Sequence, residues 1–270
     1  MTEGSMPEHV RDLLADLGQD AARVTRAANG ASNQVWLGER VVLRVGGADG
    51  ALLREAALAH LLPAEVGYPA VVGRGVGDGF EWMATERLPG RNLAEAWPHL
   101  TDDVRCRAVE DLWLRLSAVR RTDVEQARAL GCTWTPFYTL ELAGAMELLE
   151  SLTARSAIEP ETSKRLAGHL ERMFASLDGV PTTLVHTDAG PHNTVWTGTA
   201  AIPVDFEFVC LGPADLDLEM LFRSLNELRD PGASDHLVRL AAPLLELPGA
   251  RERLRGYAVL RDLWALNAAS

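Results

Sequence analysis

The segment from Leu184 to Met220 carries most of the residues that could do chemistry. It reads LVHTDAGPHNTVWTGTAAIPVDFEFVCLGPADLDLEM and contains no Lys or Arg. Its ionisable and amide side chains include His186, Asp188, Asn193, Asp205, Glu207, Asp215, Asp217 and Glu219. A segment that is acidic and otherwise apolar is not typical of a solvated surface. Because carboxylate and amide oxygens are the ligands that Mg²⁺ prefers, the segment predicts a divalent-metal site with one further carboxylate for chemistry.

Asp188, Asn193 and Asp205 are of the types that phosphoryl transfer requires. That reaction needs a carboxylate near the acceptor hydroxyl, oxygen ligands for Mg²⁺ and positive charge on the phosphates. Asp188 suits the first role, and Asn193 with Asp205 suits the second. The alternative is a pair of turns in which Asp and Asn only satisfy backbone groups. The run GPADLD that follows at 212–217 favours the catalytic interpretation.

Two other kinds of site are disfavoured. His186 and His192 lie beside carboxylates, as in a metallohydrolase, but a transition-metal site usually needs more imidazole or thiolate ligands, and Asn193 fits Mg²⁺ better. The sequence also lacks the G-x4-G-K-[ST] pattern of a P-loop nucleotide site.

Short strands are expected to position these residues. Thr194–Trp196 and a second run at 202–204 have β-type residues and flank a turn at 197–199. The polar residues stand at the ends of these runs, where a strand can hold a loop residue in place.

The N-terminal part of the chain predicts a small α+β lobe. Strands are expected at 23–27, 34–37, 41–45, 70–76 and 80–86, a loop of small residues at 29–33, and a helix at 50–62 that Pro63 ends. After the run LPGRN at 88–92, helices are expected at 137–152, 162–177, 215–228, 233–247 and 251–266, and a further one that Thr101 caps. The prediction is a two-lobed α+β fold, with an N-terminal lobe over 1–87 and a larger, mainly helical lobe over 88–270.

Composition restricts the partners. With 26 basic and 38 acidic residues the net charge is −12, which disfavours a nucleic-acid partner. No run of apolar residues is long enough to span a membrane. The acidic N-terminus lacks the apolar segment of a secretory signal, and the three widely spaced cysteines indicate reduced thiols. A cytoplasmic protein is therefore expected. The expected oligomeric state is a monomer or a homodimer.

The motifs HTDAGPHN, VDFE and GPADLDL together resemble the signature of the aminoglycoside phosphotransferase and choline kinase family, which has a protein-kinase-like fold. The resemblance implies that Asp188 is the catalytic base and that Asn193 and Asp205 bind Mg²⁺. It also implies that His186 and Asp217 support the catalytic loop. Thr187 stands where the family usually has glycine.

The resemblance extends to the N-terminal lobe and covers about residues 20 to 230. It implies a nucleotide-binding set that consists of Gly30, Ser32 and Asn33 in the loop over the phosphates, Arg44 on a strand with its partner Glu55 on the next helix, and Glu86 and Leu88 in the hinge. Arg44 replaces the Lys of protein kinases; Lys164, the one lysine of the chain, lies on a predicted helix too far along to take the role.

We therefore expect ATP-dependent, or alternatively GTP-dependent, phosphorylation of a small-molecule hydroxyl with Mg²⁺. The acidic segment favours a cationic acceptor such as an aminoglycoside-type antibiotic, with Trp134 and Tyr138 as further candidates for acceptor contacts. The alternatives are a metabolic kinase for choline, an amino alcohol or a sugar, and a non-catalytic nucleotide-binding protein.

Overall fold

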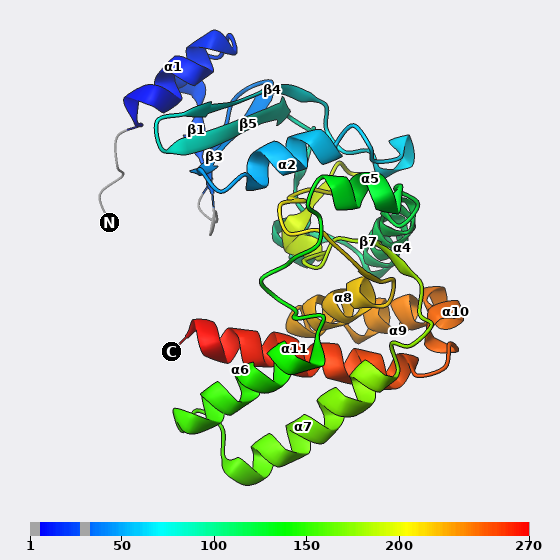
Figure 1. Cartoon of the computed structure of the whole chain (residues 1–270). Helices are drawn as coiled ribbons and strands as arrows, with labels where there is room; N and C mark the ends of the chain where they lie inside the picture. The colour runs from blue at the N-terminus through cyan, green and yellow to red at the C-terminus, as the bar shows by residue number, and fades with distance from the viewer. Residues whose placement is uncertain (1–5, 28–32, 270) are drawn as a thin grey trace. The chain divides into compact units, whose positions relative to one another are not determined.

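The computed structural model describes residues 6–27 and 33–269, and the chain divides into two compact units. One unit comprises residues 1–62 and 68–89, and the other comprises 63–67 and 90–270. The first is built around a β-sheet and the second is mainly helical (Figure 1). The predicted α+β class is confirmed.

Among the described residues, the smaller unit has a five-stranded antiparallel sheet in the order β1-β2-β3-β5-β4. The elements of this unit are α1 (Glu8–Asp16), β1 (Thr25–Arg26), β2 (Gln34–Leu37), β3 (Val41–Gly47), α2 (Ala51–Leu58), β4 (Val71–Gly77) and β5 (Phe80–Glu86). Leu43 and Val45 of β3 pack in a buried cluster with α1, whereas Leu52 of α2 packs with Met83 of β5. Since side chains alternate along a strand, Arg44 lies on the opposite face from Leu43 and Val45.

Helix α1 was not expected, and its residues Val10 and Leu14 are buried against the sheet. Two predictions for this unit also need correction. The strand expected at 23–27 is only Thr25–Arg26, because residues 21–23 form a 3₁₀ turn. The side chain of Asp20 accepts the N–H of Ala22 and caps this turn. Helix α2 ends at Leu58 rather than at residue 62, because the N–H groups of His60 and Leu61 bond to carbonyls three residues back and tighten the chain into turns.

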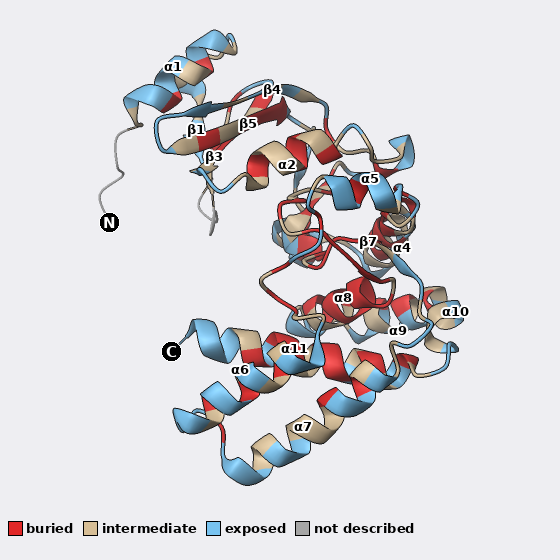
Figure 2. Cartoon of the chain, in the orientation of Figure 1, coloured by how far each residue is buried: buried red, intermediate tan, exposed pale blue. Residues whose placement is uncertain are grey.

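Among the described residues, two hydrophobic clusters hold helices of the larger unit together. One joins α4, α8 and α9, and the other joins α6, α7 and α11. The helices of this unit are α3 (Leu93–Ala96), α4 (Asp102–Val119), α5 (Val124–Ala129), α6 (Leu142–Ala154), α7 (Pro160–Ala175), α8 (Leu216–Glu227), α9 (Pro231–Leu240), α10 (Ala242–Leu245) and α11 (Ala250–Ala268). Helix α8 is buried along most of its length (Figure 2).

Short strands frame the polar segment. They are β6 (Arg91–Asn92), β7 (Thr182–Val185), β8 (Thr194–Trp196), β9 (Ala201–Pro203) and β10 (Cys210–Pro213). Strand β7 pairs with β10, and β8 pairs with β9. The loop 186–193 runs from β7 to β8, and the loop 204–209 runs from β9 to β10. The strand before the first loop pairs with the strand after the second, and the strand after the first loop pairs with the strand before the second. The two loops therefore lie side by side.

Three helix predictions for the larger unit also need correction. Helix α6 begins at Leu142 and not at Phe137. Thr101 precedes α4, as expected, but its side chain makes no capping hydrogen bond. The helix expected at 233–247 is divided into α9 and α10 at Ala241, because Pro243 has no N–H with which to continue the ladder of α9.

Candidate functional site

Both carboxylate oxygens of Asp188 are engaged. Nη2 of Arg261 donates to Oδ1 at 2.7 Å, and Nδ2 of Asn193 donates to Oδ2 at 2.9 Å. Nε2 of His192 lies 3.6 Å from Oδ2, which is long for a hydrogen bond. Burial alone raises the pKa of Asp188, but His192 and Arg261 outweigh burial and lower it to about 2. Asp188 is therefore an ionised carboxylate at neutral pH.

Asp217 fixes the start of the Asp188 loop. It lies in the first turn of α8 and is completely buried. Its Oδ1 accepts the backbone N–H groups of His186 at 2.8 Å and of Thr187 at 3.2 Å, and Arg120 lies 3.8 Å from Oδ2. Burial raises the pKa of Asp217, while Arg120 and the backbone donors oppose that rise.

His186 connects the two loops. Its Nε2 lies 3.0 Å from the carbonyl oxygen of Val204, and its ring packs against Phe206 with 4.5 Å between centroids. The ring is 1 % exposed, so it is a structural group of the loop and is not open to solvent. These contacts agree with the supporting roles expected for His186 and Asp217, which remain predictions.

Asn193 and Asp205 fit a Mg²⁺ site. Asn193 uses Nδ2 for its two contacts with Asp188, so its Oδ1 takes no part in them. Its carbonyl accepts the N–H of Val204 at 2.9 Å, which places Asp205 one residue from this bond. Asp205 has φ 69°, in the left-handed region that Asp tolerates better than most residues. Among the described residues no group of three or more His, Cys, Asp or Glu could hold a metal.

The residues expected to bind the nucleotide lie in the smaller unit. Nη1 of Arg44 donates to Glu55 at 2.6 Å, and the Tyr68 hydroxyl donates to the same carboxylate at 2.7 Å. Glu86 is the last residue of β5, and Leu88 lies two residues after it. Asn33 precedes β2, whereas Gly30 and Ser32 lie outside the described residues. The Arg44–Glu55 pair is thus formed, and the nucleotide-binding role of this set stays a prediction.

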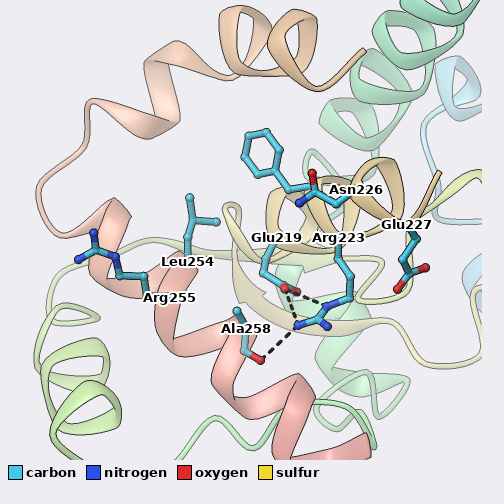
Figure 3. A pocket seen from close by; sticks show the side chains of 8 residues that line it. Glu219, Arg223, Asn226, Glu227, Leu254, Arg255 and Ala258 are labelled. Atoms are coloured by element: carbon cyan, nitrogen blue, oxygen red, sulfur yellow. Dashed lines mark hydrogen bonds and ion pairs between the residues drawn. The ribbon is translucent and has the colours of Figure 1, made fainter. Parts of the chain in front are cut away.

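An open pocket of about 590 Å³ lies between α8 and α11 (Figure 3). Its charged lining residues are Glu219, Arg223 and Glu227 of α8 and Arg255 of α11. Glu219 accepts from Arg223 at 3.1 Å. The lining does not include Asp188, but Ala258, one of the lining residues, lies about one turn of α11 before Arg261.

The two aromatic residues proposed for acceptor contacts differ in position. Tyr138 is 3 % exposed and its hydroxyl donates to Glu219 at 2.9 Å, so it supports the pocket wall from behind. Trp134 is 63 % exposed.

The arginines that neutralise the acidic segment were not predicted from the sequence. Asp188 pairs with Arg261, Asp215 with Arg253, Asp217 with Arg120 and Glu219 with Arg223. One signal for two of them was available. Arg253 and Arg261 occur on the same helical face as Tyr257 and Leu260, and an arginine among buried positions needs an acidic partner.

The sheet-containing unit, the helical unit and the paired loops around Asp188 define a kinase-like phosphotransferase. The chain belongs to the phosphotransferase enzyme family, whose profile matches residues 23–257. The predicted family and the predicted enzymatic phosphoryl transfer are confirmed. No curated protein matches the sequence.

Solved structures share the fold. The GDP complex of aminoglycoside 2'-phosphotransferase-IIIa is 18 % identical, with a TM-score of 0.70 over 96 % of this chain and 87 % of that one. An aminoglycoside phosphotransferase from Streptomyces rimosus, solved with ADP and streptomycin, is 17 % identical, with a TM-score of 0.64 over 96 % and 99 %. A choline/ethanolamine kinase family protein from Mesorhizobium loti is 20 % identical, with a TM-score of 0.67 over 97 % and 85 %.

The comparisons bear on one further expectation, the nucleotide. The nucleotides in those complexes are in line with the predicted use of ATP or GTP. Throughout residues 6–27 and 33–269, no helix combines the length and the apolar character that crossing a membrane would require.

Proposed function

We propose that this protein transfers the γ-phosphoryl group of ATP, or of GTP, to a hydroxyl of a small molecule. The observation that carries the proposal is the contact of Asp188 with Asn193, whose backbone is paired next to Asp205. The contact supports the proposal because it joins the proposed base to one proposed ligand of Mg²⁺, and the backbone bond lies one residue from the other, Asp205.

The roles of the residues follow from their chemistry. Asp188 orients the acceptor hydroxyl and accepts its proton. Asn193 and Asp205 would hold Mg²⁺, which supplies charge neutralisation for the phosphates when it is bound. Arg44, kept in place by Glu55, provides positive charge for the phosphate oxygens. Most of the rate enhancement would come from positioning and from stabilised charge.

Replacement of the proposed base tests the function. Asp188→Asn keeps the size and the hydrogen-bonding capacity of the side chain but cannot accept the proton at neutral pH. We expect turnover of the nucleotide with an acceptor to fall by roughly 10²–10⁴-fold, while binding of Mg²⁺ and ADP, measured by calorimetry, persists. Asp178→Asn, at an exposed position, is the control. Unchanged turnover in Asp188→Asn would reject the assigned base, and a wild-type protein that binds nucleotide without turnover would favour a non-catalytic role.

Two acceptor classes remain candidates. An aminoglycoside-type antibiotic is supported by similarity to kinases solved with kanamycin or streptomycin. A metabolic acceptor is favoured by the arginines that pair with Asp188 and Glu219, because they remove the surplus negative charge that would attract a polycation. A panel of antibiotics, amino alcohols and sugars, assayed by release of ADP, separates these candidates; inactivity with every cationic antibiotic would exclude the first.

A further inference from the structure

We infer that Arg261 of α11 determines acceptor specificity, and that the acceptor bears a carboxylate or a similar oxyanion near the hydroxyl that is phosphorylated. The inference rests on the proposed function, in which Asp188 is the base. It adds the chemical class of the acceptor.

The position of Arg261 makes it part of the acceptor environment. Its Nη2 donates to Oδ1 of Asp188 at 2.7 Å, although the two residues are 73 positions apart in the sequence. A hydroxyl that approaches Asp188 within hydrogen-bond distance therefore also comes close to the guanidinium. A group attached next to that hydroxyl will experience its positive charge.

Aromatic rings keep the guanidinium in place. The Cζ atom of Arg261 lies 3.8 Å from the ring centroid of Phe137, 5.0 Å from that of Trp264 and 5.8 Å from that of Tyr138. Phe137 and Trp264 also contact each other edge to face. Stacking covers the face of the planar group and leaves its N–H edge for hydrogen bonds. Arg261 is 9 % exposed, so its orientation is determined by packing.

The hydrogen-bonding capacity of Arg261 is not used up. Its Nη1 is buried, and among the described residues it has no hydrogen-bond partner. A buried donor without a partner is destabilising, and an oxygen atom of a ligand would satisfy it. A carboxylate suits a guanidinium best, since its two oxygens match the spacing of adjacent N–H groups.

The surrounding charges do not favour a cation. Asp215, Asp217 and Glu219 each have an arginine partner, as Asp188 does. In the pocket between α8 and α11 the two glutamates are likewise balanced by two arginines. An ammonium group near Asp188 would have to compete with Arg261 for the carboxylate, whereas an oxyanion would be attracted by Arg261.

A set of acceptors on one scaffold tests the inference. Glucuronate, glucose and glucosamine share a hexose ring and carry a carboxylate, no charge and an ammonium group, respectively. Glycerate, glycerol and 3-aminopropane-1,2-diol form a smaller set with the same three groups in the same order. We expect kcat/KM, measured by ADP release with Mg²⁺ and ATP, to be highest for the carboxylate member of at least one set. Preference for the ammonium member in both sets would overturn the inference.

Variants of Arg261 separate specificity from structure. Arg261→Gln should lower the ratio of kcat/KM for the carboxylate acceptor to that for the neutral acceptor by about 10-fold or more, mainly through KM, and Arg261→Lys should restore part of it. Loss of a merely structural contact would reduce turnover of both acceptors and leave their ratio unchanged, and that result would reject the specificity role. Arg251→Gln, at an exposed position on the same helix, is the control.

The results that would contradict the proposed function differ from those that would contradict the role of Arg261. Absence of ADP release with every acceptor, or full activity of Asp188→Asn, would contradict phosphoryl transfer by this site. Activity that is confined to amine-bearing acceptors would leave the proposed function intact and reject the inference about Arg261.

Discussion

Thr187 shows how a residue that differs from the family motif can be accommodated. Its φ is 63°, in the left-handed region that is unfavourable for a β-branched residue. Its hydroxyl donates to the carbonyl of Phe208 at 2.8 Å and lies 3.2 Å from the Thr135 hydroxyl. The side chain therefore makes buried hydrogen bonds that a glycine could not make, and these offset the backbone strain.

Two substitutions at this position should differ in stability. Thr187→Val keeps the strain and removes the hydroxyl, so we expect unfolding to become easier by about 1–3 kcal/mol. Thr187→Gly loses the same bonds but relieves the strain, and it should be destabilised less. Chemical denaturation monitored by circular dichroism compares them. A valine variant as stable as wild type would show that the hydroxyl contributes nothing.

At the scale of the elements, Arg253 links α11 to its neighbours. Its Nε donates to Asp215 at 2.7 Å, and its Nη1 donates to the carbonyls of Ser176 at 3.0 Å and Pro248 at 2.8 Å. These contacts join the start of α11 to the end of α7 and the start of α8. Because α11 also carries Arg261, the anchor of the helix helps to position the side chain that contacts Asp188.

Removal of this anchor should destabilise the larger unit. Arg253→Met leaves Asp215 buried without its charged partner, and we expect a loss of about 3–5 kcal/mol in unfolding free energy. The double variant Arg253→Met with Asp215→Asn should recover part of the loss, since no unpaired charge remains. Thermal unfolding by calorimetry measures both. Equal stability of Arg253→Met and wild type would exclude the anchoring role.

Local sequence patterns predicted two of the strands that frame the site, β8 and β9, but they predicted neither β6, β7 and β10 nor all of the site residues. The β8–β9 hairpin follows from β-type runs around a short turn, and the family motif indicated Asp188, Asn193 and Asp205. The pairing of β7 with β10 and the contact between Asp188 and Arg261 depend on residues 25 or more positions apart, which no local pattern encodes. Phe137 was assigned to a helix because apolar spacing does not distinguish a helical face from a loop that packs around an arginine.

At the scale of the whole molecule, ligand binding should appear as added stability. A ligand that binds only the folded protein at about 100 times its Kd adds about 2.7 kcal/mol, which corresponds to a rise in Tm of roughly 5–10 °C for a chain of this size. We expect this rise with ADP and Mg²⁺, and a much smaller one with ADP and EDTA.

The control for the metal is Asp205→Asn, which should lose most of the difference between Mg²⁺ and EDTA. Differential scanning fluorimetry measures all four conditions. The same rise in Tm with and without Mg²⁺ would reject Asn193 and Asp205 as its binding residues.

The place of Arg261 in the chain has a genetic consequence. The match to the family profile ends at residue 257, before Arg261, and the motif residues lie earlier still. A premature stop codon shortly after codon 257 would leave every recognisable motif of the reading frame intact and yet delete the side chain that contacts Asp188. A gene truncated in this way would still be counted as a kinase by a survey of motifs, while its product would lack the group that we propose selects the acceptor.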